Sequence, residues 1–348
     1  MPLDRNLVRR APKVLLHDHL DGGLRVPTIR ELAEQVGHQL PAEGDDALAA
    51  WFYQGKGGTD LVRYLSAFEH TVALLQTEEA LTRVAREAAE DLAADGVVYA
   101  ELRYAPELST SGGLELDAVF DALAAGLAAG PDAIETRLLA CIMRHEDRGE
   151  EVVAAALRAR ERGVPVVGVD LAGPEAGFPA AKHATALRTA ADGGLRLTLH
   201  AGEAYGPPSI GDALDQGADR LGHGVRIIDD IGPDGTLGQV ARRVLDGEVA
   251  LELCPTSNVH TGVCEDVTSH PIGRLTDLGF AVTVSTDNRL MSGVEMTSEL
   301  HTVASTFGWG PEQLEQVTRT ALDAAFVDEP TRAALAHRVT EGFAPLRG

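Results

Sequence analysis

Residues 13–22 read "KVLLHDHLDG", an apolar run that ends in two histidines spaced one residue apart. Side chains at positions i and i+2 of a β-strand point to the same side, so His17 and His19 can face a common centre. Burying two imidazoles at the end of a strand costs free energy unless they have polar partners. The stretch therefore predicts a buried strand that carries functional histidines at its carboxyl end.

Seven more apolar runs follow, and most are separated by stretches with helical periodicity, such as 79–94 and 148–162. The predicted strands are 13–19, 97–104, 137–144, 164–173, 196–203, 219–224, 249–258 and 281–288. Near-continuous apolar strands are typical of a parallel sheet covered on both faces. Eight such units predict an α/β fold, a closed (β/α)8 TIM barrel. A doubly wound open sheet is the alternative, but no G-x-G-x-x-G follows the first strand.

The segments outside the alternating strands and helices predict two additions to the barrel. The long segment between the first two strands predicts a helical lid insertion, and residues 291–348 predict extra helices that close the barrel. No repeat or low-complexity linker divides the chain, so residues 1–348 are expected to form a single domain.

Histidines and acids stand at the carboxyl ends of five of the eight runs, where barrel active sites form. They are His17 and His19, Asp170, His200 and Glu203, His223, and Asp287. Imidazole nitrogen and carboxylate oxygen suit Zn²⁺. The predicted ligands of one zinc ion are His17, His19, His200 and Asp287. Glu203 is placed to donate or accept a proton beside the metal, and His223 is either a fifth ligand or an electrostatic partner of the hydroxide.

Neither six further histidines nor the lysines of the chain predict a second metal. Ordinary structural roles are expected for His70, His145, His183, His260, His270 and His301. Barrel hydrolases with two metals often bridge them with a carboxylated lysine. The three lysines of this chain, Lys13, Lys56 and Lys182, do not end a predicted strand, so a mononuclear site is expected.

Composition excludes several classes of partner. The formal net charge is -23, and so acidic a chain is repelled by nucleic acid and by anionic lipid. No apolar run reaches the roughly 18 residues of a membrane-spanning helix, and the charged start is unlike a secretory signal. Cys141, Cys254 and Cys264 lack C-x-x-C spacing, which favours reduced thiols in a cytoplasmic protein. The oligomeric state stays open.

Six segments, in this order, resemble the adenosine deaminase family of the amidohydrolase superfamily. They are "HDHLDGGLR", "VDLAGPE", "LTLHAGE", "RLGHGVRI", "ELCPTSN" and "VTVSTDN". The resemblance implies a (β/α)8 barrel, one zinc ion per chain, and hydrolytic deamination of adenosine or 2′-deoxyadenosine to inosine or 2′-deoxyinosine plus ammonia. The alternative is a related 6-aminopurine, either adenine or an aminofutalosine-type nucleoside.

The resemblance also implies roles for single residues. His17, His19, His200 and Asp287 match the family's zinc ligands. Asp21 matches the acid that binds the ribose 5′-hydroxyl, and Gly173 matches the glycine whose N–H contacts purine N3. Glu203 matches the acid that protonates N1, and His223 matches the histidine that holds the attacking hydroxide. Either Asp287 or His223 would accept the proton of the attacking water.

The helical stretch 61–68, "LVRYLSAF", resembles the family's apolar lid. Its residues expected to face the ribose are Leu61, Tyr64, Leu65 and Phe68. An ordinary amphipathic helix packed on the barrel is the alternative for this stretch.

Two positions depart from the family pattern. Asn288 stands where a second acid is usual, and its amide can donate a hydrogen bond to purine N7 without first taking up a proton. Pro174 replaces the acid that usually follows the glycine, which removes one N–H from that loop.

Overall fold

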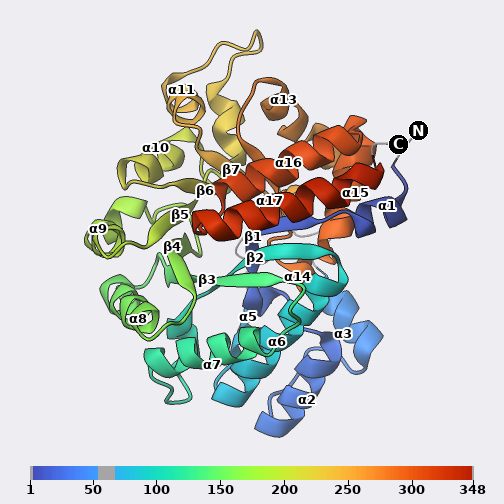
Figure 1. Cartoon of the computed structure of the whole chain (residues 1–348). Helices are drawn as coiled ribbons and strands as arrows, with labels where there is room; N and C mark the ends of the chain where they lie inside the picture. Colours follow the sequence, from blue (N-terminus) through green and yellow to red (C-terminus); the bar gives the residue numbers. More distant parts are fainter. Residues whose placement is uncertain (1–2, 54–66, 347–348) are drawn as a thin grey trace.

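Eight parallel strands follow one another around a barrel in chain order (Figure 1). The structure, a computed structural model, describes residues 3–53 and 67–346. The strands are β1 (Lys13–His19), β2 (Val97–Tyr104), β3 (Glu135–Met143), β4 (Val166–Ala172), β5 (Arg196–Ala201), β6 (Arg220–His223), β7 (Ala250–Leu253) and β8 (Val282–Val284). Each strand pairs with the next in parallel register. The predicted (β/α)8 barrel is confirmed, and the open sheet is wrong.

The barrel closes between the end of β1 and the segment after β8. A parallel bridge joins Asp18 to Asp287. The backbone N–H of His19 donates to the carbonyl of Asp287 at 2.7 Å, and the N–H of Asp287 donates to the carbonyl of His17 at 2.9 Å. The backbone that closes the barrel therefore belongs to three residues of the histidine and aspartate motifs.

Strand β1 contains a bulge immediately before that closure. Its register against β2 changes between Leu15, which pairs with Ala100, and Asp18, which pairs with Leu102. A bulge adds one residue to a strand and redirects the side chains that follow it. Asp18 is fully buried and accepts hydrogen bonds from Thr286 and Arg289, so it fastens β1 to the segment after β8.

Helices surround the barrel and extend it at both predicted places (Figure 1). The α-helices are α1 (Arg5–Arg10), α2 (Val26–Val36), α3 (Asp45–Phe52), α5 (Phe68–Leu74), α6 (Glu78–Ala94), α7 (Leu116–Ala128), α8 (Gly149–Glu161), α9 (Ala184–Asp192), α10 (Pro207–Asp215), α11 (Gln239–Asp246), α12 (Pro255–His260), α13 (Ile272–Asp277), α14 (Arg289–Ser292), α15 (Met296–Phe307), α16 (Pro311–Ala324) and α17 (Glu329–Phe343). The helices described between β1 and β2 are α2, α3, α5 and α6, and α16, near the carboxyl end of the chain, contacts β8 and β1.

Two predicted strands are too long. The segment predicted as a strand over 249–258 leaves the sheet after Leu253, and α12 begins at Pro255, where a missing N–H costs nothing. The segment predicted over 281–288 ends as a strand at Val284. Asp287 then adopts a φ of 60°, a conformation that L residues rarely take and that strand periodicity cannot predict. Among the described helices, none is long and apolar enough to cross a bilayer.

Charged side chains form ion pairs in the barrel interior, both between neighbouring strands and across the barrel. Arg220 on β6 makes ion pairs with Glu101 on β2 and, at 2.7 Å, with Glu252 on β7. Tyr99 and the backbone N–H of Phe326 also donate to Glu101. Since all these groups are buried, the carboxylates depend on their partners to remain charged.

Replacing Arg220 tests this interior network. Arg220→Leu is expected to lower the free energy of unfolding by about 3–5 kcal/mol, because Glu101 and Glu252 lose a buried cation. The matched control Arg243→Leu removes a surface pair with Asp215 and should cost about 1 kcal/mol or less. Denaturant unfolding measures both variants, and equal losses would contradict a special role for the interior pairs.

Candidate active site

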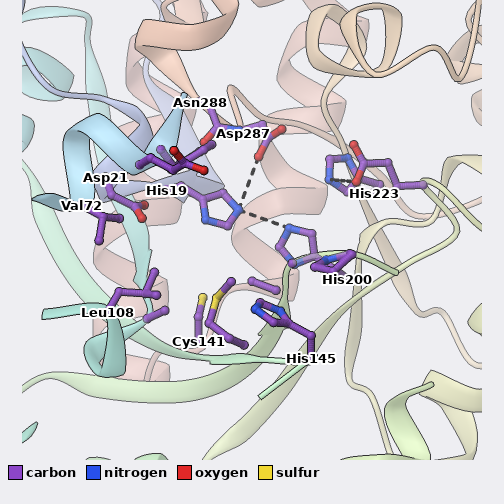
Figure 2. Close-up of a pocket in the computed structure, with 18 residues that line it drawn as sticks. His19, Asp21, Val72, Leu108, Cys141, His145, His200, His223, Asp287 and Asn288 are labelled. Carbon is purple, nitrogen blue, oxygen red and sulfur yellow. Dashed lines mark hydrogen bonds and ion pairs between the residues drawn. The ribbon is translucent and has the colours of Figure 1, made fainter. Parts of the chain in front are cut away.

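Imidazole nitrogens and a carboxylate oxygen converge at the carboxyl end of the barrel (Figure 2). Nε2 of His17 lies 3.3 Å and Nε2 of His19 lies 3.5 Å from Oδ1 of Asp287. Nε2 of His19 lies 3.2 Å from Nε2 of His200. Side chains from β1, β5 and the segment after β8 thus meet at one point, as the strand-end pattern predicted.

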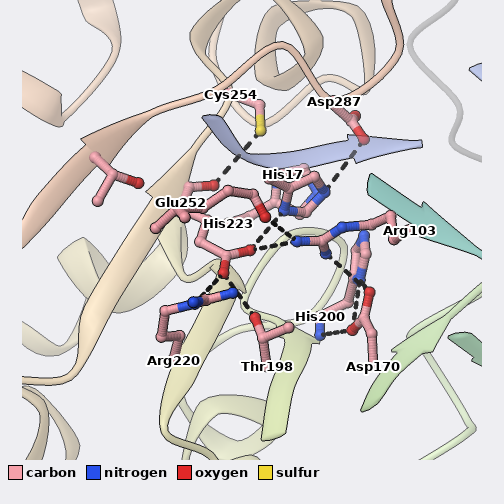
Figure 3. Close-up of polar contacts among 12 residues, drawn as sticks. His17, Arg103, Asp170, Thr198, His200, Arg220, His223, Glu252, Cys254 and Asp287 are labelled. Carbon is pink, nitrogen blue, oxygen red and sulfur yellow. Dashed lines mark hydrogen bonds and ion pairs between the residues drawn. The ribbon is translucent and has the colours of Figure 1, made fainter. Parts of the chain in front are cut away.

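The protonation of His17 shows that this convergence suits a cation. Its Nδ1 lies 3.0 Å from a carboxylate oxygen of Glu252, which can only accept, so Nδ1 carries the proton (Figure 3). Burial and then the charge of Arg103 lower the pKa of His17 to about 4, which keeps the ring neutral. The lone pair of Nε2 then faces the Asp287 carboxylate, and Nε2 is buried with no hydrogen-bond partner. Two acceptors this close favour a metal ion between them.

His200 is oriented in the same way. Its Nδ1 lies 2.8 Å from Oδ2 of Asp170, and its backbone N–H donates to Oδ1 of the same carboxylate. Carboxylates that hold the Nδ1–H of a histidine are a usual second layer around protein metal sites. Both Nε2 atoms are therefore free to bind a metal.

Arg103 links the two carboxylates behind these histidines (Figure 3). Its guanidinium contacts Asp170 at 2.8 Å and Glu252 at 2.7 Å, and it is fully buried. Burial would raise the pKa of Glu252, but the charges of Arg103 and Arg220 outweigh it and hold that pKa well below its ordinary value. Both carboxylates are thereby kept ionised, which keeps the imidazole protons on Nδ1.

Asp287 and His223 adopt unusual backbone conformations. Both have φ of 60°. Such conformations cost roughly 1–3 kcal/mol each and persist where the surroundings impose them, often at active sites. The hydroxyl of Ser257 donates to Oδ2 of Asp287 at 2.5 Å, and the amide of Asn258 contacts Nδ1 of His223 at 3.1 Å. The start of helix α12 therefore positions both strained residues.

Geometry allows more than one set of metal ligands. Among the described residues, one group of possible ligand atoms lies within 4.8 Å of one another, and it comprises His17, His200, His223 and Asp287. The set predicted from sequence contains His19 in place of His223. Mutual distance alone thus groups His223 with His17, His200 and Asp287, whereas His19 approaches only Asp287 at 3.5 Å and His200 at 3.2 Å.

Glu203 sits beside this cluster with its carboxyl buried. Its Oε2 lies 3.6 Å from Nε2 of His223. Burial raises the pKa of Glu203 above its ordinary value, which favours a protonated carboxyl that can donate. The structure places Glu203 beside the cluster, and its role in proton transfer stays a prediction.

Glu175 secures the loop that carries Glu203. Its carboxylate accepts backbone N–H bonds from Gly202 at 2.6 Å, Glu203 at 3.0 Å, Ala204 at 2.6 Å and Tyr205 at 2.9 Å. Four donors on one buried carboxylate define the turn after β5. This role was not predicted, because an acid two residues after Gly173 carries no signal of its partners thirty residues later.

A cavity of about 310 Å³ opens beside the cluster. Ligand pockets for small molecules begin at roughly this size. Its polar wall includes Asp21, Asn288 and the backbone at Gly173, and its apolar wall includes Phe68. Asp21 Oδ1 and Asn288 Oδ1 are buried without hydrogen-bond partners. Of the predicted lid residues, Leu61, Tyr64 and Leu65 lie outside the described residues.

Two histidines expected to be merely structural lie near the site. His145 lines the cavity, beside the position that a side chain at Gly173 would occupy. His270 donates toward Asn258, which in turn contacts His223. Neither ends a predicted strand, so the strand-end criterion missed them. It also missed Glu252 and Arg103, which lie within apolar runs; an isolated charge inside such a run is the signal that could have identified them.

Comparisons with known proteins agree along the chain. The family model described as adenosine deaminase matches residues 12–342. A protein of Mycolicibacterium gilvum named adenosine deaminase is 49% identical over 351 residues, covering 97% of this chain and 96% of the relative. One of Mycobacterium tuberculosis with the same name is 48% identical over 355 residues, covering 98% and 97%.

Solved structures share the fold at lower identity. Adenine deaminase from Arthrobacter aurescens has a TM-score of 0.86 and 28% identity, covering 95% of this chain and 98% of that one. N6-methyl-AMP deaminase from Arabidopsis thaliana has a TM-score of 0.84 and 27% identity, covering 98% and 99%. An amidohydrolase from Burkholderia ambifaria, solved with bound Zn, has a TM-score of 0.85 and 26% identity, covering 99% and 93%.

Removing one imidazole tests the metal site. His17→Ala is expected to abolish stoichiometric binding of a divalent transition metal, because His17 supplies a buried nitrogen that belongs to both possible ligand sets. The matched control His337→Ala alters an exposed histidine on α17 and should keep the wild-type metal content. Elemental analysis of unchelated protein measures both, and full metal content in His17→Ala would contradict the assignment.

Proposed function

Since the chain belongs to the adenosine deaminase family, we propose that it is a zinc-dependent hydrolase that converts adenosine and 2′-deoxyadenosine to inosine and 2′-deoxyinosine plus ammonia. The observation that carries the proposal is the meeting of three parts in one cavity. A buried group of imidazoles and one carboxylate lies beside a buried acid, Glu203, and both border a cavity large enough for a nucleoside.

Zinc is the metal that we propose for the cluster. Three imidazole nitrogens and one carboxylate oxygen suit Zn²⁺ and leave room for water. When bound there, zinc would polarise a water molecule and lower its pKa toward neutrality, so that a nucleophile exists at pH 7. The bound Zn of the Burkholderia ambifaria relative supports this choice.

Two residues of the chain then transfer protons, Asp287 as an acceptor and Glu203 as a donor. Asp287 lies within 3.5 Å of Nε2 of both His17 and His19, and its carboxylate can accept the proton of the attacking water. Burial raises the pKa of Glu203, which favours its protonated form, and that form can give a proton to N1 of the purine. That transfer prevents negative charge from accumulating on the ring as C6 becomes tetrahedral. The proton taken up by Asp287 can then pass to the 6-amino group, which leaves as ammonia, while the proton of the C6 hydroxyl returns to Glu203.

The cavity favours a nucleoside over a nucleotide. Among the described residues that line it there is no lysine or arginine, whereas Asp21 and Glu69 contribute carboxyl groups. A 5′-phosphate would find no counter-charge on those walls, unlike a neutral 5′-hydroxyl that can bond to Asp21. N6-methyl-AMP, the compound for which the Arabidopsis relative is named, is therefore expected to fit this cavity less well than adenosine.

Free adenine and aminofutalosine-type nucleosides remain the alternative substrates. The Arthrobacter aurescens relative is named for adenine. Figure 2 shows Asp21 on the side of the cavity away from His223, where a base without its ribose would leave it unpaired. Relative kcat/KM values for adenosine, adenine, AMP and a 5′-modified nucleoside distinguish these substrates.

We also propose a cytoplasmic location, supported by free thiols at all three cysteines.

Glu203 provides the most direct test of the chemistry. Glu203→Gln is expected to lower kcat for adenosine by roughly 10²-fold or more while the zinc content stays unchanged, because glutamine cannot supply the N1 proton. The matched control Glu341→Gln replaces an exposed acid on α17 and should leave kcat unchanged. Deamination is followed by the change in ultraviolet absorbance and by ammonia release. Near-normal turnover in Glu203→Gln would refute the proposed role.

Asn288 tests how the purine is recognised. Asn288→Asp is expected to raise KM for adenosine by about tenfold, because the carboxyl must first take up a proton before it can donate to N7, whereas the amide donates without one. The inhibition constant of 7-deazaadenosine, which lacks that acceptor, should change far less. Equal changes for both compounds would show that Asn288 does not contact N7.

A further inference from the structure

The hydrogen bonds behind His223 have a fixed direction that begins at the backbone. The N–H of Ile272 donates to Nδ1 of His270 at 3.1 Å. A backbone N–H can only donate, so Nδ1 of His270 accepts and its proton must sit on Nε2. His270 is buried, and burial followed by the nearby His223 lowers its pKa to about 3, which keeps the ring neutral.

The next bond orients the amide of Asn258. Nε2 of His270 lies 3.1 Å from Oδ1 of Asn258, and since this nitrogen carries the proton, Oδ1 accepts. The NH2 group of Asn258 therefore points the other way, toward Nδ1 of His223 at 3.1 Å. Asn258 has no exposed surface, so water cannot substitute for either contact.

The opposite orientation of Asn258 is chemically excluded. A rotated amide would place its NH2 group against Nε2 of His270. That nitrogen would then have to accept while Nδ1 also accepts, which requires an imidazole without any proton. The backbone N–H of Ile272 thus determines the direction of every bond up to His223.

We propose that Asn258 and His270 are positioning residues that hold His223 as the tautomer protonated on Nε2. His223 then donates a hydrogen bond into the site and neither binds the metal nor removes the proton of the attacking water. This inference rests on the proposed function for its catalytic meaning, although the tautomer itself does not.

The same rule separates His223 from the two histidines beside it. His17 and His200 face carboxylates at Nδ1, so their protons sit there and their Nε2 lone pairs are free for a metal. His223 faces an amide donor at Nδ1, so its Nε2 carries the proton. A protonated Nε2 has no lone pair for a metal, so the set with His19 is assigned even though mutual distance groups His223 with His17, His200 and Asp287. The proton of the attacking water then goes to Asp287.

Nitrogen-15 NMR of the histidine rings tests the tautomer. Zinc-loaded protein labelled with ¹⁵N-histidine is measured without substrate, and His223 is identified by the signals that disappear in His223→Gln. We expect an unprotonated Nδ1 and a protonated Nε2. A protonated Nδ1, or the signature of a metal-bound Nε2, would overturn the proposal.

Two variants test the residues behind His223. Asn258→Asp replaces the donor by a carboxylate of the same shape, so the proton of His223 should move to Nδ1, and kcat should fall by about tenfold or more with a smaller change in KM. His270→Gln keeps a donor at the position of Nε2 and should retain the wild-type tautomer, with kcat within about threefold. Retention of the Nε2–H tautomer in Asn258→Asp, or its loss in His270→Gln, would contradict the relay. If Asn258→Asp does not fold, the wild-type spectrum and His270→Gln decide.

The outcomes separate this inference from the proposed function. Protein with the expected tautomer that does not deaminate adenosine supports the relay and refutes the proposed function. Protein that deaminates adenosine while His223 is protonated on Nδ1 refutes the relay and supports the function.

Discussion

Two backbone hydrogen bonds between β1 and the segment after β8 are the constraint on which the site depends. They join His17 and His19 to Asp287, and they are also the bonds that close the barrel. Closing the barrel and bringing together the side chains that could hold a metal are therefore one event in this chain. The cost is a left-handed backbone at Asp287, which the closed barrel and the hydroxyl of Ser257 maintain.

Around that closure, the partner of each imidazole Nδ1 sets the chemistry of its Nε2. Carboxylates behind His17 and His200 leave lone pairs that can bind a metal, and the amide behind His223 leaves a donor. Arg103 makes this arrangement stable by neutralising the carboxylates in the interior. Charges inside the barrel are thus more than structural, since they determine which histidines act as bases toward a metal and which one donates.

The sequence predicted the barrel and the residues at its mouth because both follow from local patterns. Apolar runs marked the strands, and His17, His200 and Asp287 followed from their positions at strand ends. The layer behind them could not be predicted in the same way. Glu175 and Asn258 act through hydrogen bonds to residues that are distant in sequence, and those contacts become visible only in the folded structure. The predicted end of β8 was wrong because the strand ends at Val284, and closure of the barrel gives Asp287 a left-handed backbone that strand periodicity cannot indicate.

The account rests on one ion being held where β1 meets the segment after β8. Anomalous diffraction at the zinc edge, from crystals of unchelated protein, locates that ion directly. We predict a single peak at about 2.0–2.2 Å from Nε2 of His17, His19 and His200 and from one oxygen of Asp287. An ion within bonding distance of His223 and not of His19, or an ion that is not bonded to Asp287, would contradict the account.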